Sequence, residues 1–282
     1  MKCAWEAYLA VLPIWMRQDV DKLGKDTLQE IRLRLDRPVE MKLFGKRISL
    51  DRSVSRDDLS FVINAASRYS PWSARTTTQG YITAPGGHRI GLCGEVVAGE
   101  RGMQGIREPT SLCLRVARDF PGVGKHAAQV GGSLLIIGSP GSGKTTLLRD
   151  IIRQKSDVLE QTVTVVDERE EIFPRWQSSF CFPPGRCTDI LSGCNKREAV
   201  TMLLRTMAPD WVALDEITTL EDCEFFLKNA WCGVKFLATA HAESLKDLQK
   251  REIYNRLLES GIFSYCAVLR RDQTFVLERM VI

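Results

Sequence analysis

The segment from residue 138 to residue 145 constrains this chain more than any other part of its sequence. It reads GSPGSGKT and fits the P-loop pattern GxxxxGK followed by Ser or Thr. The apolar run Leu134 to Ile137 precedes it, and a stretch of helical composition from Lys144 to about Lys155 follows. A strand, a glycine-rich loop and a helix in this order are the context that a P-loop requires. The sequence therefore predicts a site for the phosphates of a nucleotide.

Each residue type in this loop has a chemical reason. Glycines let consecutive backbone N–H groups curl around phosphate oxygens, and the helix N-terminus adds positive potential. We expect Lys144 to reach the β- and γ-phosphates of ATP and the hydroxyl of Thr145 to ligate Mg²⁺. The expected nucleotide-binding residues are Gly138, Ser139, Pro140, Gly141, Ser142, Gly143, Lys144, Thr145 and Thr146.

A pair of acids follows a second apolar run. The run Trp211 to Leu214 ends in Asp215 and Glu216, which places both acids at the carboxyl edge of a sheet, where ligands bind in open α/β folds. We expect Asp215 to hold Mg²⁺ and Glu216 to polarise the water that attacks the γ-phosphate. The alternative is an acidic helix cap after a core strand.

Two further strand ends carry candidate residues. The acidic stretch at 167–171 follows the apolar run Val163 to Val166, and its position favours a functional role for Asp167 and Glu168 over a solvated loop. His241 follows another apolar run, in the place where P-loop ATPases have a polar sensor of the γ-phosphate. A lone histidine at a strand end can also be structural.

The segment between residues 121 and 132 is rich in glycine, which predicts a domain boundary near residue 128. In residues 129–282, apolar runs alternate with helical stretches at 196–207 and 219–231, which predicts an α/β domain with a largely parallel sheet. Strands at 267–269 and 275–277 are expected to finish this sheet as a hairpin.

Residues 1–128 predict a smaller α+β domain. Its expected elements are strands at 28–35 and 39–44, a helix at 57–68, a hairpin of 81–83 with 90–97, and a strand at 111–117. This part holds 20 Lys and Arg residues against 14 Asp and Glu, whereas the rest of the chain holds 19 against 21. Such an excess is usually a solvated surface, but it can contact the phosphates of nucleic acid or of a nucleotide on a neighbouring subunit.

Composition excludes several other classes of protein. Apolar residues make up 44% and charged residues 26%, as in ordinary globular domains. The longest uncharged run, 17 residues from 127 to 143, is broken by glycines and a proline, so we expect no membrane span. The N-terminus lacks a signal-peptide pattern, and nine cysteines without a CxxC pair indicate reduced thiols. We therefore expect a cytoplasmic protein, without zinc at Cys181, Cys187 and Cys194.

Taken in order, these motifs resemble the ATPase core of the type II/IV secretion superfamily. They are the P-loop, the acidic stretch at 167–171, the segment 205–216 and the pair Ala240-His241. Additional segments at 29–38, 87–91, 111–118 and 188–196 are similar to the stage III sporulation protein AA family. This resemblance implies a RecA-like P-loop NTPase domain in a cytoplasmic ATPase of the mother cell, peripheral to a secretion-like channel that joins it to the forespore.

The resemblance also implies partners and roles for particular residues. It implies a homo-oligomeric, hexameric ring and a membrane platform protein of the channel. Arginine fingers in the superfamily come from the N-terminal domain, which makes Arg89, Arg115 and Arg118 the candidates here. Secretion ATPases commonly have glycine where this chain has Asp215, so the general base could be Glu216, which we favour, or Glu168.

Three other functions compete with this interpretation. Leu191-Ser-Gly193 imitates part of an ABC-type signature, but Cys194 and Asn195 replace the expected glycine and glutamine. A nucleic-acid-stimulated ATPase is the stronger alternative because of the net charge of +6 on residues 1–128; even so, nucleic acid is the less favoured partner. A purely structural protein is disfavoured because the chain has a full set of catalytic residue types.

Overall fold

A computed structural model describes residues 1–67, 80–99, 102–176, 178–194, 196–229, 232–270 and 272–280. The chain divides into two compact units. The first comprises Met1–Asp119 together with Pro174–Phe182, and the second comprises Phe120–Phe173 together with Pro183–Ile282. The division falls slightly before the expected boundary at residue 128. A short segment from the second half of the chain belongs to the first unit.

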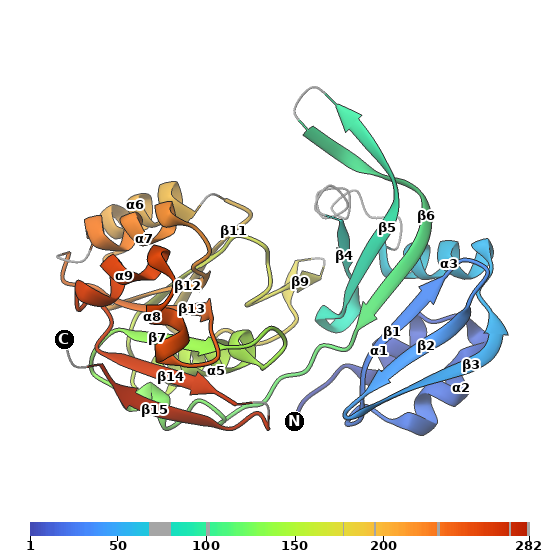
Figure 1. The fold of residues 1–282 in the computed structure, drawn as a ribbon, viewed down its shortest axis with the longest axis horizontal. Helices are drawn as coiled ribbons and strands as arrows, with labels where there is room; N and C mark the ends of the chain where they lie inside the picture. The colour runs from blue at the N-terminus through green and yellow to red at the C-terminus, as the bar shows by residue number, and fades with distance from the viewer. Residues whose placement is uncertain are drawn as a thin grey trace. The chain divides into compact units, whose positions relative to one another are not determined.

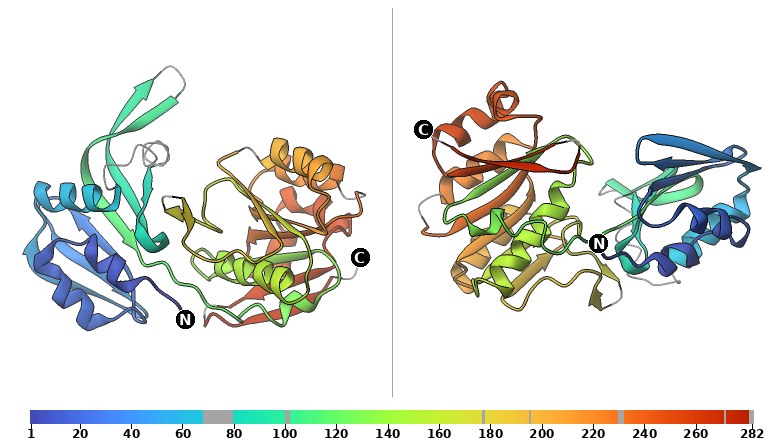
Figure 2. Two further views of the ribbon diagram at one scale, coloured as in Figure 1. Left: turned by 180° about the vertical axis from the view of Figure 1, so that it is seen from behind. Right: turned by 90° about the horizontal axis from the view of Figure 1, so that it is seen from below.

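The first unit contains an antiparallel sheet with the strand order β3-β2-β1-β6-β5-β4 among the described residues. Its strands are β1 (Leu28–Arg34), β2 (Pro38–Leu43), β3 (Lys46–Ser53), β4 (Tyr81–Thr83), β5 (Arg89–Gly99) and β6 (Gly102–Arg115). Helices α1 (Trp5–Ala10), α2 (Ile14–Leu23) and α3 (Arg56–Ser67) cover one face of the sheet (Figure 2). Apolar residues alternate along the strands because one face packs on these helices, and Ile31 and Leu33 of β1 are fully buried.

The segment 174–182 adds a small hairpin to the first unit. Strand β9 (Arg175–Trp176) pairs with β10 (Ser179–Phe180). The Cβ of an alanine at Gly87 would lie 3.0 Å from Cys181 Cβ and 3.1 Å from Pro174 Cγ. Gly87 has φ +79°, so both its backbone conformation and this close approach favour glycine.

His88 is fully buried in the first unit and connects three distant parts of it. Its Nδ1 accepts a hydrogen bond from the backbone N–H of Ala117 at 3.0 Å. Nε2 therefore carries the proton and donates to the carbonyl of Ala4 at 2.9 Å. The ring also packs edge-on against Tyr8. Burial lowers the pKa of His88 from 6.5 to about 4, so the histidine stays neutral in the folded protein at neutral pH.

We expect His88 to make the protein less stable at acidic pH. Between pH 6.5 and about 4 the unfolded chain binds a proton at this residue and the folded chain does not, so stability falls as the pH falls. The free energy of unfolding should drop by about 2–3 kcal/mol between pH 7 and about pH 4.5 through this group. Urea denaturation of His88→Gln should lack that part of the pH dependence, whereas His126→Gln, a change at an exposed histidine, should keep it. Equal pH dependence in wild type and His88→Gln would contradict the assignment.

The second unit contains a sheet with the strand order β11-β8-β12-β13-β7-β14-β15 among the described residues (Figure 1). Its strands are β7 (Leu134–Gly138), β8 (Val163–Asp167), β11 (Thr188–Ser192), β12 (Trp211–Glu216), β13 (Lys235–His241), β14 (Tyr265–Leu269) and β15 (Phe275–Arg279). All neighbours are parallel except β15, which forms an antiparallel hairpin with β14. The predicted α/β fold with a largely parallel sheet and a preceding smaller domain is confirmed.

Helices cover both faces of this sheet. Alternate residues of β7 explain the layers: Leu135 and Ile137 join an apolar cluster with α6 (Lys196–Thr206), α7 (Leu220–Asn229), α8 (Leu245–Gln249) and α9 (Glu252–Glu259). Helix α5 (Lys144–Asp157) lies on the opposite face (Figure 1). The central strands are therefore buried on both sides, and this explains why they are continuous apolar runs.

The chain passes from one unit to the other three times. Near each of these crossings, a buried charged side chain of α5 forms a hydrogen bond with the backbone. The Asp150 carboxylate accepts the backbone N–H groups of Gly122 at 3.0 Å and Gly124 at 2.7 Å. Arg149 Nε donates to the carbonyl of Ile172 at 2.5 Å, and Arg153 Nε donates to the carbonyl of Pro183 at 3.1 Å. One helix thus holds all three connecting segments.

Candidate nucleotide site

The loop between β7 and α5 has the backbone of a phosphate cradle. Gly141 and Gly143 adopt φ of +76° and +102°, a region that side chains with a Cβ rarely enter. At Gly138, a Cβ would lie 2.4 Å from Ser142 Oγ and 3.1 Å from Leu269 Cβ. Gly141 and Gly143 therefore allow the turn of the loop, and Gly138 allows its close packing against Ser142 and Leu269.

Lys144, the first residue of α5, is buried at the mouth of this loop. Its Nζ lies 3.1 Å from the carbonyl oxygen of Gly138, 3.3 Å from that of Ser139 and 2.7 Å from His241 Nδ1. Burial lowers the pKa of Lys144, while the carboxylates of Glu216 and Asp215 act in the opposite direction. The loop thus holds the ammonium group beside its own backbone carbonyls.

His241 joins this lysine to Glu216. The ammonium of Lys144 only donates, so His241 Nδ1 is the acceptor and Nε2 carries the ring proton. Nε2 lies 2.8 Å from Glu216 Oε1 and donates to it. Strand register explains the arrangement, because His241 pairs with Gly138 across β13 and β7, and Glu216 pairs with Thr239 across β12 and β13. The structure therefore brings three predicted site residues, Lys144, His241 and Glu216, into one hydrogen-bonded chain.

Asp215 lies beside this chain at a bulge in β12. Between Ala213 and Glu216, β12 contains one residue more than the paired segment of β13. Such a bulge changes the direction of the side chains at the end of a strand. Burial raises the pKa of Asp215 to about 7, and the carboxylates of Glu171 and Asp167 add to this effect. A carboxylate in such crowded acidic surroundings is suited to a cation.

The acidic stretch after β8 contains one structural and one accessible acid. Asp167 is fully buried, and its carboxylate accepts the backbone N–H groups of Glu171, Ile172 and Phe173 at 2.8 to 3.1 Å. Those bonds fix the turn, which gives Asp167 a structural role. Glu168 is 40% exposed and lies 3.6 Å from Lys196 Nζ. The sequence predicts a helix that begins at Lys196 but no role for this residue, because its closeness to Glu168 becomes visible only in the fold.

The loop and its neighbours fit a magnesium nucleotide. Ser142 Oγ is buried and has no hydrogen-bond partner in the part of the chain that the structure describes, so it can donate to a phosphate oxygen. Thr145 lies in the first turn of α5. Its hydroxyl and the carboxylate of Asp215 are oxygen donors, which Mg²⁺ prefers. The remaining predicted loop residues, Ser139, Pro140 and Thr146, lie partly or fully exposed in the same loop and first turn.

The three candidate arginine fingers have different surroundings within the first unit. Arg89 stacks over the ring of Tyr81 at 3.9 Å from its centroid. Arg118 donates to the carbonyls of Lys25 and Leu28 and is partly buried, which lowers its pKa. Arg115 is 63% exposed and lies 3.9 Å from a carboxylate oxygen of Glu30. Arg118 therefore has a structural role, and Arg115 is the most accessible of the three.

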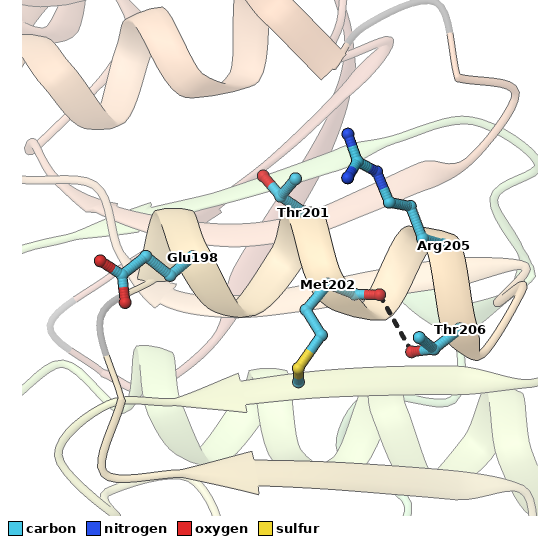
Figure 3. Close-up of a pocket in the computed structure, with 5 residues that line it drawn as sticks. All are labelled: Glu198, Thr201, Met202, Arg205 and Thr206. Atoms are coloured by element: carbon cyan, nitrogen blue, oxygen red, sulfur yellow. Dashed lines mark hydrogen bonds between the residues drawn. The ribbon is translucent and has the colours of Figure 1, made fainter.

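A shallow hollow along α6 is separate from the loop. Its lining residues are Glu198, Thr201, Met202, Arg205 and Thr206 (Figure 3). All five lie on one helix, and Thr206 Oγ1 donates to the carbonyl of Met202 at 2.9 Å. The hollow is an exposed helix face rather than an enclosed ligand site. Of the ABC-like segment before this helix, Asn195 lies outside the described residues.

Solved structures show the same fold. The pilus retraction motor PilT with bound ADP has a TM-score of 0.59 and 16% sequence identity, and covers 94% of this chain and 81% of its own. The ATPase DotB of Legionella pneumophila has a TM-score of 0.58 and 17% identity, and covers 95% of this chain and 80% of its own. Within the described ranges, each helix is too short or too polar to span a bilayer. The fold is that of the type II/IV secretion ATPases.

Sequence comparison defines the family more narrowly. The family described as Sporulation stage III, protein AA, matches residues 8–275. Stage III sporulation protein AA of Bacillus subtilis (strain 168) is 33% identical over 274 residues, which cover 93% of this chain and 89% of that protein. The chain therefore belongs to the stage III sporulation protein AA family, and the predicted resemblance is confirmed.

Proposed function

We propose that this protein hydrolyses ATP with Mg²⁺ and is the motor of a secretion-like channel between mother cell and forespore during endospore formation. The observation that carries the proposal is the hydrogen-bonded chain from Lys144 through His241 to Glu216 at the mouth of the P-loop. An ammonium group, an imidazole and a carboxylate in this order support a site for the γ-phosphate of ATP at this edge. The secretion-ATPase fold and the family support the motor role.

The residues of the site divide the work of phosphoryl transfer. The glycine-rich backbone binds the phosphates, and Lys144 exchanges the carbonyls of Gly138 and Ser139 for phosphate oxygens. Thr145 and Asp215 would hold Mg²⁺, which would supply positive charge to the same oxygens. Glu216 accepts a hydrogen bond from a water molecule and orients it for in-line attack. His241 holds Glu216 and senses the γ-phosphate through Lys144.

Glu216 is preferred over Glu168 as the general base because the side chains of the two acids contact different residues. Its carboxylate bonds to His241, which is bonded to the P-loop lysine. Glu168, the second candidate, faces Lys196 instead. Glu216 is thus the acid in contact with the phosphate-binding residues.

The direct experiment is phosphate release from ATP by the purified protein. Hydrolysis should require Mg²⁺, stop when EDTA removes the metal, and resume when Mg²⁺ is restored in excess. Mg²⁺ neutralises the phosphate oxygens, so the uncatalysed rate should be approached without it. Hydrolysis that is absent with Mg²⁺ present, in protein shown to be folded, would refute the proposal.

We further propose that the active unit is a hexameric ring on the cytoplasmic side of a membrane channel, docked on a membrane platform protein. In this arrangement an arginine of the first unit reaches the nucleotide of a neighbouring subunit. Arg115 is the preferred candidate, and Arg89 and Arg118 are the alternatives. The exposed guanidinium of Arg115 and the basic excess of residues 1–128 support a cation supplied in trans. A closed ring uses such a head-to-tail interface repeatedly.

A further inference from the structure

Lys196 lies at the same sheet edge as the proposed catalytic acids. It is the first residue of α6, and its side chain is only 15% exposed. Its Nζ donates to the backbone carbonyl of Glu216 at 2.6 Å. The same ammonium lies 3.6 Å from Glu168 Oε2. One cation therefore contacts the backbone of Glu216 and the carboxylate of Glu168, the two residues that compete for the role of general base.

The bond to Glu216 fixes one peptide unit from both sides. The carbonyl of Glu216 and the N–H of Ile217 belong to the same planar peptide. Lys196 donates to its oxygen, and Thr239 O accepts its N–H at 2.8 Å. This peptide directly follows the bulge in β12, where the regular ladder no longer determines backbone direction. The side chain of Glu216 leaves from this fixed peptide towards His241.

The ion pair with Glu168 adds a positive charge to an edge of the sheet that is rich in carboxylates. Asp167, Glu168, Asp215 and Glu216 gather at one edge of the sheet, and like charges at such spacing repel one another. Lys196 compensates the most exposed of these carboxylates, that of Glu168. Glu216 remains as the carboxylate bonded to His241.

We propose that Lys196 is a positioning residue for ATP hydrolysis, which fixes the backbone of Glu216 and pairs with the carboxylate of Glu168. This inference rests on the proposed ATPase function. Lys196 acts through the two glutamates and does not itself touch the phosphates. It should therefore affect turnover more than nucleotide binding.

The test compares Lys196→Met, which removes the ammonium and keeps the stem, with Lys196→Arg and with Lys228→Met. Lys228 is an exposed lysine on α7 and serves as the matched control. Loss of a hydrogen bond from a charged group is expected to lower kcat of Lys196→Met roughly tenfold or more. The dissociation constant of a fluorescent ATP analogue should change less than about threefold. Lys196→Arg should retain most of the turnover.

Hydrogen exchange supplies a readout that does not depend on activity. In Lys196→Met the amide of Ile217 should exchange faster, because the peptide loses its fixed carbonyl partner, while the amides of β7 and β8 remain protected. Turnover equal to that of Lys228→Met, or unchanged exchange at Ile217, would overturn the proposal. If Lys196→Met does not fold, Lys196→Arg decides: active protein supports a positioning cation, and folded, inactive protein overturns it. Wild-type protein without hydrolysis would refute the proposed function instead, and the exchange experiment would still test the role of Lys196.

Discussion

Glu216→Gln is expected to lower the turnover of ATP at least roughly a hundredfold and to leave nucleotide binding nearly unchanged. The amide has the shape of the carboxylate, and its oxygen can still accept the hydrogen bond from His241 Nε2. It cannot orient and deprotonate water as a carboxylate does. Steady-state phosphate release gives the turnover, and the fluorescence of a labelled ATP analogue gives the affinity. Loss of both together would indicate damage to the loop rather than loss of the base.

Glu168→Gln is the matched control for this variant. It makes the same chemical change at the acid that faces Lys196, so turnover should fall far less than in Glu216→Gln. The opposite order, with the large loss in Glu168→Gln, would make Glu168 the base and give Glu216 a structural role beside His241.

Lys144→Ala is expected to reduce ATP hydrolysis to background. The substitution removes the ammonium that we expect on the β- and γ-phosphates and also removes the partner of His241 Nδ1. Circular dichroism should show an intact fold, because the glycines that adopt the positive-φ backbone of the loop are unchanged. Turnover close to wild type would remove the basis for the P-loop assignment.

The same variant tests whether a cation arrives from a neighbouring subunit. Lys144→Ala subunits keep their arginines, so they can complement subunits that carry alanine at Arg89, Arg115 and Arg118 but keep the P-loop lysine. Each preparation alone should be nearly inactive, and the mixture should regain activity at interfaces that combine an intact loop with an intact arginine. Light scattering confirms co-assembly; co-assembled mixtures that remain inactive would argue against a cation in trans. Arg115→Ala alone separates an accessible finger from the structural contacts of Arg118.

The second unit could be predicted largely from local sequence. Its central strands are buried on both faces, so each appears as a continuous apolar run, and the P-loop pattern marks the junction of β7 and α5. The parallel arrangement then places Asp215, Glu216 and His241 at one edge without further information. Strand β11 was not expected, because its residues Thr188–Ser192 lie at the sheet edge, are only partly buried and mix polar with apolar types.

Other features depend on contacts that sequence does not reveal. Helices α1 and α2 and strand β3 of the first unit were not expected, since short elements with mixed composition lack a clear period. Asp167 was a functional candidate by position, but three backbone N–H groups determine its role. Lys196 could not be linked to Glu216 because the two residues lie on different elements. Only the packing of α6 against the sheet brings them together.

The hairpin of β9 and β10 has a consequence for how this chain could have been inherited. Residues 174–182 complete the first unit, yet they are encoded within the sequence of the second. A single recombination event that exchanged everything before residue 120 would bring in a foreign surface around Gly87 and leave the native Pro174 and Cys181 facing it. The three segments held by Arg149, Asp150 and Arg153 would have to be matched at the same time. The two units are therefore expected to evolve as a linked pair, with compensating substitutions between residues 80–90 and 174–182, rather than to be shuffled as independent modules.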